Sequence, residues 1–174
     1  AYVVSLVKCV VPTETIGYID SAAVLRHSIH VNSASYQHDD ARSSSKYGYK
    51  LYALVHRECS YHAPTFRRMG YNVLIRDTPV DVADIANEYY RDAIVTKKGG
   101  CCGAAEFIKL HAYNLTNHPV VVLLDLDALV LRPLDDLFDA MLLYDGGTTT
   151  HRDAAAVEVG RAARKRLELE FHGE

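Results

Sequence analysis

Two aspartates, Asp125 and Asp127, stand one residue apart within the otherwise apolar run 120–131. The five residues before Asp125 are all valine or leucine, which predicts a strand buried on both faces of a parallel sheet. A buried carboxylate is costly unless it is paired or bound to a cation. We therefore expect both aspartates to lie where the strand leaves the sheet and to share one divalent metal ion, because side chains at i and i+2 of an extended segment point the same way.

Such a metal site would suit a ligand that carries phosphates. A divalent ion between the carboxylates and a diphosphate stabilises the departing phosphate oxygens, and a lysine such as Lys109 adds a second positive charge. Mn²⁺ or Mg²⁺ fits a site made of oxygen ligands. The glycine-rich segment 96–103 could bring backbone N–H groups to the phosphates, although it also fits a solvated turn. The alternative for the two aspartates is that they cap the turn that follows the strand.

The apolar pattern predicts alternating strands and helices. Strands are expected at 2–11, 49–55, 71–75 and 120–124, and helices at 18–30, 60–69, 104–114 and 134–138. Gly70 is the expected stop signal of the second helix. The third helix should turn Phe107, Ile108, Leu110 and Ala112 toward the core. A polar loop is expected at 32–46 and a partly helical segment at 80–93. This order predicts an α/β fold with a mostly parallel sheet and helices on both faces.

The composition is that of an ordinary globular protein. The chain has 174 residues, of which 49% are hydrophobic, and this is enough for one domain with its own core. A net charge of −3 argues against nucleic acid or an anionic membrane as the main partner, and no apolar stretch is long enough to span a bilayer. We expect a domain at 1–145 and a divergent, helical tail at 146–174, with a helix over 154–171. The start at Ala1 suggests a fragment.

The four cysteines are Cys9, Cys59, Cys101 and Cys102, and no two have the C-x-x-C spacing. The adjacent pair could be a redox or metal element, but neighbouring cysteines rarely bridge each other without strain. We therefore expect the cysteines to be free thiols, which act as small buried side chains or lie in loops. Free thiols favour the cytosol over the Golgi.

Residues 107–116, the following strand and residues 125–139 together resemble family 8 of the glycosyltransferases, the glycogenin and galactinol synthase group. In that family a Thr/Ile-Lys-Leu helix precedes an apolar strand and an Asp-x-Asp-x-Leu-Val-Leu motif, and here Lys109 and Asp125 stand at the family's separation. The N-terminal strand resembles the family's nucleotide-cradling strand. The resemblance implies a GT-A-like, Rossmann-like fold and retaining transfer of a hexose from UDP-glucose or UDP-galactose, with Mn²⁺, to a glycan, protein or small-molecule acceptor.

The resemblance also implies roles for individual residues. They are metal binding for Asp125 and Asp127, with Leu126 between them in the donor site, assistance of the diphosphate for Lys109, and the uridine pocket for Ser5, Leu6 and Tyr18. The family's later Asn-Ser-Gly element, Asp-Gln pair and metal-binding histidine are not recognisable here. We therefore expect a donor half truncated at its C-terminal side, which binds UDP weakly and transfers sugar slowly or not at all.

Two other functions remain open from the sequence. An apolar strand followed by Asp-x-Asp also resembles the haloacid-dehalogenase-like phosphatases, in which Asp125 would be the nucleophile beside Mg²⁺. Against this, Ala128 and Leu129 replace the usual Gly-Thr of those enzymes. The other possibility is a non-catalytic domain that binds a nucleotide sugar, which the missing acceptor elements favour.

Overall fold

The computed structural model describes residues 1–9, 12–33, 45, 47–95, 102–142 and 158–165, with the backbone alone for 12–16. The chain forms two compact units, one made of 1–27 and 50–129 and the other of 28–49 and 130–174. Each unit is therefore built from two stretches that lie far apart in the sequence.

A four-stranded, all-parallel sheet forms the centre of the first unit, in the order β3-β2-β1-β4. The strands are β1 (Tyr2–Leu6), β2 (Leu51–His56), β3 (Asn72–Arg76) and β4 (Val122–Leu123). The apolar sequences of β1 and β2 suit these inner positions, because an inner strand of a parallel sheet is covered on both faces. The predicted α/β class and parallel sheet are confirmed.

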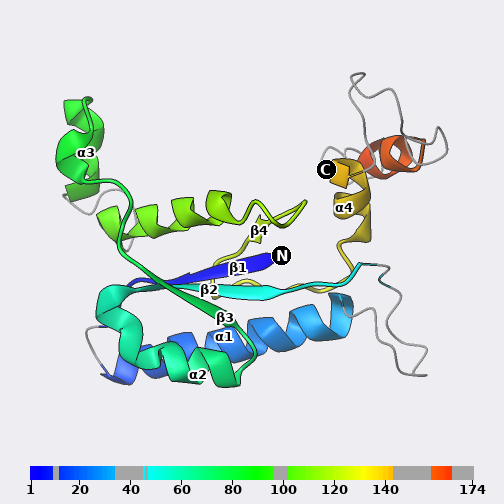
Figure 1. Ribbon diagram of the computed structural model, residues 1–174, viewed down its shortest axis with the longest axis horizontal. Helices are drawn as coiled ribbons and strands as arrows, with labels where there is room; N and C mark the ends of the chain where they lie inside the picture. Colours follow the sequence, from blue (N-terminus) through cyan, green and yellow to red (C-terminus); the bar gives the residue numbers. More distant parts are fainter. Residues whose placement is uncertain (10–11, 34–44, 46, 96–101, 143–157, 166–174) are drawn as a thin grey trace. The chain divides into compact units, whose positions relative to one another are not determined.

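Helices cover both faces of this sheet (Figure 1). The helices α1 (Pro12–Ser33) and α2 (Ala63–Arg68) lie on one face, and the 3₁₀ helix η3 (Gly103–Asn114) lies on the other. Under η3, a buried cluster joins the sheet to the helix. Its members are Val3, Leu54, Ile108 and Ala112. This cluster fixes η3 to the two inner strands.

Tyr71 ties the opposite helical layer to the start of β3. Its ring lies edge-on to Phe66 of α2, with ring centroids 5.4 Å apart, and its hydroxyl donates a hydrogen bond to the carbonyl oxygen of Ala22 in α1 at 2.8 Å. Burial raises the pKa of the Tyr71 phenol, against the opposing charge of Arg26. The buried hydroxyl therefore stays protonated, and its hydrogen bond to Ala22 avoids an unpaired polar group in the core.

The remaining elements of the first unit connect its strands. They are η1 (Arg57–His62), η2 (Val82–Asp84) and α3 (Glu88–Val95). The helix predicted at 60–69 is therefore split between η1 and α2. It ends before Gly70 as predicted, and Gly70 has φ +90°, a conformation that a side chain would disfavour.

The second unit contains α4 (Asp135–Leu142) and a helix at 158–165, which lies within the helix predicted at 154–171. Two aspartates of α4 accept hydrogen bonds from residues at the end of the predicted polar loop and just after it. Tyr47 donates to Asp139 at 2.5 Å, and Ser45 donates to Asp135 at 2.7 Å. These bonds hold the two stretches of this unit together.

Two predictions of burial are wrong. β4 is an edge strand with two paired residues, and the Leu123 side chain is 39% exposed, so this segment is not buried on both faces. Leu110 of η3 is 42% exposed. The residues of η3 that reach the sheet are Ile108 and Ala112, and a residue midway between them points to the other side of the helix.

Parts of several predictions fall outside the described residues. They are the end of the first strand (10–11), most of the polar loop (34–44 and 46), most of the glycine-rich segment (96–101) and much of the tail (146–157 and 166–174). Among the helices that the structure describes, none has the length and apolar character that crossing a bilayer requires.

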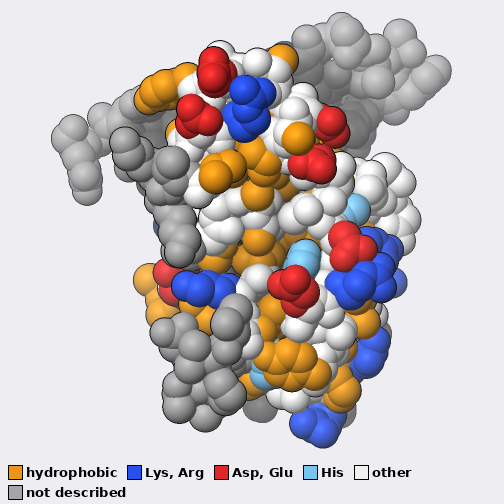
Figure 2. Space-filling view, turned by 90° about the vertical axis from the view of Figure 1, so that its left-hand side faces the viewer, with side chains coloured by type: hydrophobic (Ala, Val, Ile, Leu, Met, Phe, Trp, Pro, Cys, Tyr) orange, Lys and Arg blue, Asp and Glu red, His pale blue; other side chains and the backbone are white. Residues whose placement is uncertain are grey.

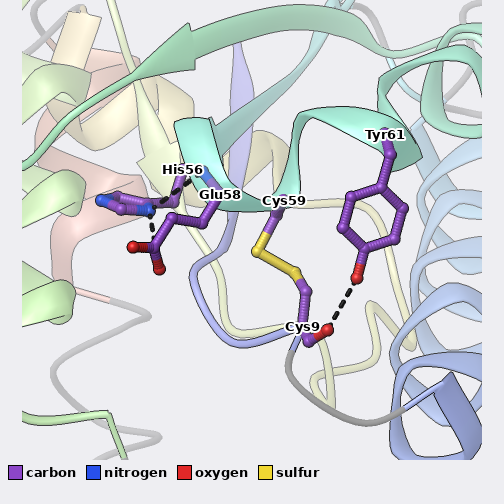
Figure 3. Close-up of a disulfide and its surroundings, with 5 residues drawn as sticks. All are labelled: Cys9, His56, Glu58, Cys59 and Tyr61. Atoms are coloured by element: carbon purple, nitrogen blue, oxygen red, sulfur yellow. Dashed lines mark hydrogen bonds and ion pairs between the residues drawn. A yellow bond between two sulfur atoms is a disulfide. The ribbon is translucent and has the colours of Figure 1, made fainter.

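The expectation that all cysteines are free thiols is wrong, because Cys9 and Cys59 form a disulfide (Figure 3). The bond joins the segment that leaves β1 to η1, which follows β2. Next to it, the Tyr61 hydroxyl donates a hydrogen bond to the carbonyl oxygen of Cys9 at 2.6 Å (Figure 3). A spacing of 50 residues gives no local sign of this pairing. Because the cytosol was favoured on the ground of free thiols, that preference loses its support.

Breaking this disulfide should destabilise the protein. A Cys9→Ser/Cys59→Ser double variant should lose about 2–4 kcal/mol of unfolding free energy, because the crosslink restricts the unfolded chain. Urea unfolding of the two proteins measures the loss. A dithiol reductant should lower the stability of the wild type and leave the double variant unchanged. Four reactive thiols in the denatured, unreduced wild type would show that the bond does not form.

Candidate functional site

A pocket of about 440 Å³ opens where β1 and β4 end. Parallel strands place their carboxyl ends at one edge of the sheet, which is where ligands of open α/β sheets bind. All seven residues that the sequence assigned to a site line this pocket. They are Ser5, Leu6, Tyr18, Lys109, Asp125, Leu126 and Asp127. The face of the molecule toward which the strands run carries acidic, basic and histidine side chains among apolar ones (Figure 2).

The seven residues come from four segments. Ser5 and Leu6 are the last residues of β1, Tyr18 lies in α1, and Lys109 lies in η3. The aspartates come after β4, separated from it by Leu124, so the parallel pairing of β4 with β1 brings them beside the end of β1. These seven residues thus bring two carboxylates, an ammonium group, the Ser5 hydroxyl and the Tyr18 phenol to the pocket.

Lys109 is held between two carboxylates. Its Nζ donates to Oδ1 of Asp125 at 2.7 Å and lies 2.6 Å from Oε2 of Glu106. Burial alone would lower the pKa of Lys109, but the hydrogen bonds to Asp125 and Glu106 outweigh burial and raise it. The ammonium group therefore stays charged at neutral pH.

The two aspartates lie in a turn and not on an extended strand. The backbone N–H of Ala128 donates to the carbonyl oxygen of Asp125 at 3.1 Å, which closes the turn. The prediction that strand alternation gives both side chains one direction is therefore wrong, yet the turn still leaves both carboxylates on the pocket wall. Both residues are exposed, and the Asp125 side chain keeps 67% of its surface in solvent.

The donor atoms suit a hard divalent cation that arrives with a phosphate ligand. In the described part of the chain, no three or more His, Cys, Asp or Glu side chains are grouped to hold a metal ion. Mg²⁺-like ions are commonly held by one or two carboxylates, with water and substrate phosphates as the other ligands. Asp125 and Asp127 are two carboxylates of the kind that this arrangement needs.

Five further residues line the pocket that were not among the seven predicted site residues. They are Val7, Lys8, Ser21, Cys102 and Glu106. Glu106 could have been found, because it stands three residues before Lys109, a spacing that brings side chains together on a helix. Val7 and Lys8 directly follow β1. Ser21 carries no signal of its own, since only the packing of α1 against the sheet brings it here. Cys102 belongs to the glycine-rich segment 96–103, which the sequence suggested near the phosphates; residues 96–101 of that segment lie outside the described residues.

A group of polar contacts links η3 to the segments that follow β2 and β3. Arg57 makes a bidentate ion pair with Asp77, with hydrogen bonds of 2.8–3.0 Å. The hydrogen bond and charge of Arg57 lower the pKa of the Asp77 carboxyl. The ring Nε2 of His111 lies 2.9 Å from the carbonyl oxygen of Asp77. His111 is two residues after Lys109, so this contact helps to place Lys109 along the pocket.

Comparison with known proteins gives no match: no family model, curated protein or solved structure is similar to this chain.

The Lys109 ion pairs should stabilise the fold at neutral pH. Because the pKa of Lys109 is raised above 10.5, this stabilisation is complete below that pH and is lost as the pH rises through the raised value. Lys109→Met should therefore cost about 1 kcal/mol of unfolding free energy at pH 7, with the partly exposed partners keeping the value small.

Urea unfolding of the wild type and Lys109→Met at pH 7 and at alkaline pH checks this expectation. The difference in unfolding free energy between the two proteins should become smaller as the pH rises above 10.5. Equal stabilities at pH 7 would mean that the ion pairs contribute nothing.

Proposed function

We propose that this chain binds a nucleoside-diphosphate sugar together with a divalent cation and transfers its hexose to an acceptor. One observation carries the proposal: residues from four segments, to which the resemblance gives roles in a donor site, line one pocket at the carboxyl edge of a parallel sheet. A GT-A-like site of this kind would take UDP-glucose or UDP-galactose.

In this proposal Asp125 and Asp127 hold Mn²⁺ or Mg²⁺. The cation would act as a Lewis acid that offsets negative charge on the diphosphate. Side chains of the pocket would bind and orient the diphosphate. The Lys109 ammonium group binds the diphosphate oxygens and favours the charge that develops on them as the sugar departs. Its partial burial strengthens this interaction relative to bulk water.

The other end of the pocket would receive the nucleoside. The Ser5 hydroxyl can hydrogen-bond to a ribose or base, and Leu6 offers an apolar surface beside it. Tyr18 adds an aromatic ring, against which a base can pack. Such a mixture of apolar wall and few polar groups is typical of small-molecule sites. The acceptor, whether glycan, protein or small molecule, would approach the sugar from the solvent side.

Removing one aspartate should abolish metal-dependent nucleotide binding. Asp125→Asn should weaken the Mn²⁺-dependent binding of UDP at least about tenfold, because one of two charged ligands is lost. Calorimetry of UDP in Mn²⁺ and in EDTA measures the effect. The control variant is Asp20→Asn, which removes an exposed carboxylate of α1 outside the pocket. UDP binding that is absent, or equally strong in EDTA, would contradict the proposal.

Product analysis separates the proposed transferase from its two alternatives. Because the family's acceptor elements are not recognisable in this chain, long incubation of the protein with UDP-hexose, Mn²⁺ and a panel of acceptors should yield UDP and a glycosylated product or free hexose only slowly, and Asp125→Asn should stop the reaction. Release of inorganic phosphate from phosphate monoesters, lost in Asp125→Asn, would instead indicate a phosphatase. Metal-dependent UDP binding without turnover would identify a binding domain.

A further inference from the structure

We infer that Glu106 is a positioning residue that receives the Lys109 ammonium group when a divalent cation binds Asp125. The inference rests on the proposed function, since it describes how the same pocket exchanges one cation for another. Glu106 itself need not touch either the metal or the nucleotide.

In the pocket, one ammonium group lies between two carboxylates. Nζ of Lys109 is 2.7 Å from Asp125 and 2.6 Å from Glu106, so both carboxylates compete for the same cation. The Lys109 and Glu106 side chains are 27% and 32% exposed, while that of Asp125 is 67% exposed. Asp125 is thus the partner that solvent and a dissolved cation reach more readily.

A divalent cation at Asp125 conflicts with Lys109 in its observed position. Two positive charges repel at such short range, most strongly where water is partly excluded. The ammonium group must then move away from Asp125 or weaken metal binding. Glu106 offers it a carboxylate that needs no new contact, because the ion pair between Glu106 and Lys109 already exists.

The local structure keeps Glu106 available. The two residues are three positions apart in η3, and in a 3₁₀ helix such residues lie above one another. Glu106 therefore stays beside Lys109 while the ammonium group shifts. It keeps the positive charge inside the pocket, where the diphosphate would lie, and prevents its loss to solvent.

A simpler role for Glu106 is a helix ion pair that only stabilises η3. That role predicts that Glu106→Gln changes the unfolding free energy but leaves the Mn²⁺ affinity unchanged. A second alternative is that the charge of Glu106 attracts Mn²⁺ through space, which would act whether or not Lys109 is present. A double-mutant cycle distinguishes both from the exchange.

The cycle compares the wild type, Glu106→Gln, Lys109→Met and the double variant. The readout is the dissociation constant of Mn²⁺ alone, followed by the EPR signal of free Mn²⁺. Glu88→Gln is the matched control, since Glu88 is exposed on α3 and lies outside the pocket lining. Circular dichroism and unfolding curves identify any variant that does not fold.

Glu106→Gln should weaken Mn²⁺ binding about threefold to fivefold, a size typical of a partly exposed ion pair. In the Lys109→Met background the same substitution should change the affinity no more than Glu88→Gln does. An equal or larger effect in that background overturns the inference, and so does an unchanged affinity in Glu106→Gln alone. If the wild type takes up neither Mn²⁺ nor UDP, the proposed function fails as well.

Discussion

The parallel pairing of β1 with β2 on one side and β4 on the other decides where the polar residues of this chain meet. Strands that run the same way must end at the same edge, so the residues that follow them become neighbours. Ser5 and Asp125 are far apart in the sequence and line one pocket for this reason. A different order of the same strands would separate the carboxylates from the end of β1.

The helices complete the site because they are fixed to this sheet. Ile108 and Ala112 bury one side of η3 against β1 and β2, which leaves Glu106 and Lys109 at the pocket wall. On the segment that leaves β1, the disulfide of Cys9 and the hydrogen bond from Tyr61 hold the chain directly after Lys8. The pocket is therefore enclosed by elements that are each anchored elsewhere in the first unit.

The negative charge of the pocket carboxylates is partly offset by the ammonium group of Lys109. Lys109 lies between the carboxylates of Glu106 and Asp125 and reduces their mutual repulsion, and its two contacts explain why it remains charged. This balance also sets a condition on any metal ion that binds there, since the ion must compete with an ammonium group already in contact with Asp125. The affinity of the site for a metal ion thus depends on how the carboxylates of Asp125 and Glu106 are divided between that ion and Lys109.

The sequence alone determined the α/β class, the parallel sheet and the stop at Gly70, because these follow from local periodicity and turn signals. It also pointed to Asp125, Asp127 and Lys109 through their chemistry, whereas Ser5, Leu6 and Tyr18 were named through the family resemblance; all of these residues line one pocket. It did not determine that β4 is a short edge strand, that the aspartates lie in a turn, or that Leu110 is exposed. Nor did it predict the Cys9–Cys59 bond or the contact of Glu106 with Lys109. The Glu106–Lys109 contact had a local sign in its spacing of three residues within one helix. The tertiary structure decided the other features, because strand order and the packing of distant segments depend on the whole chain.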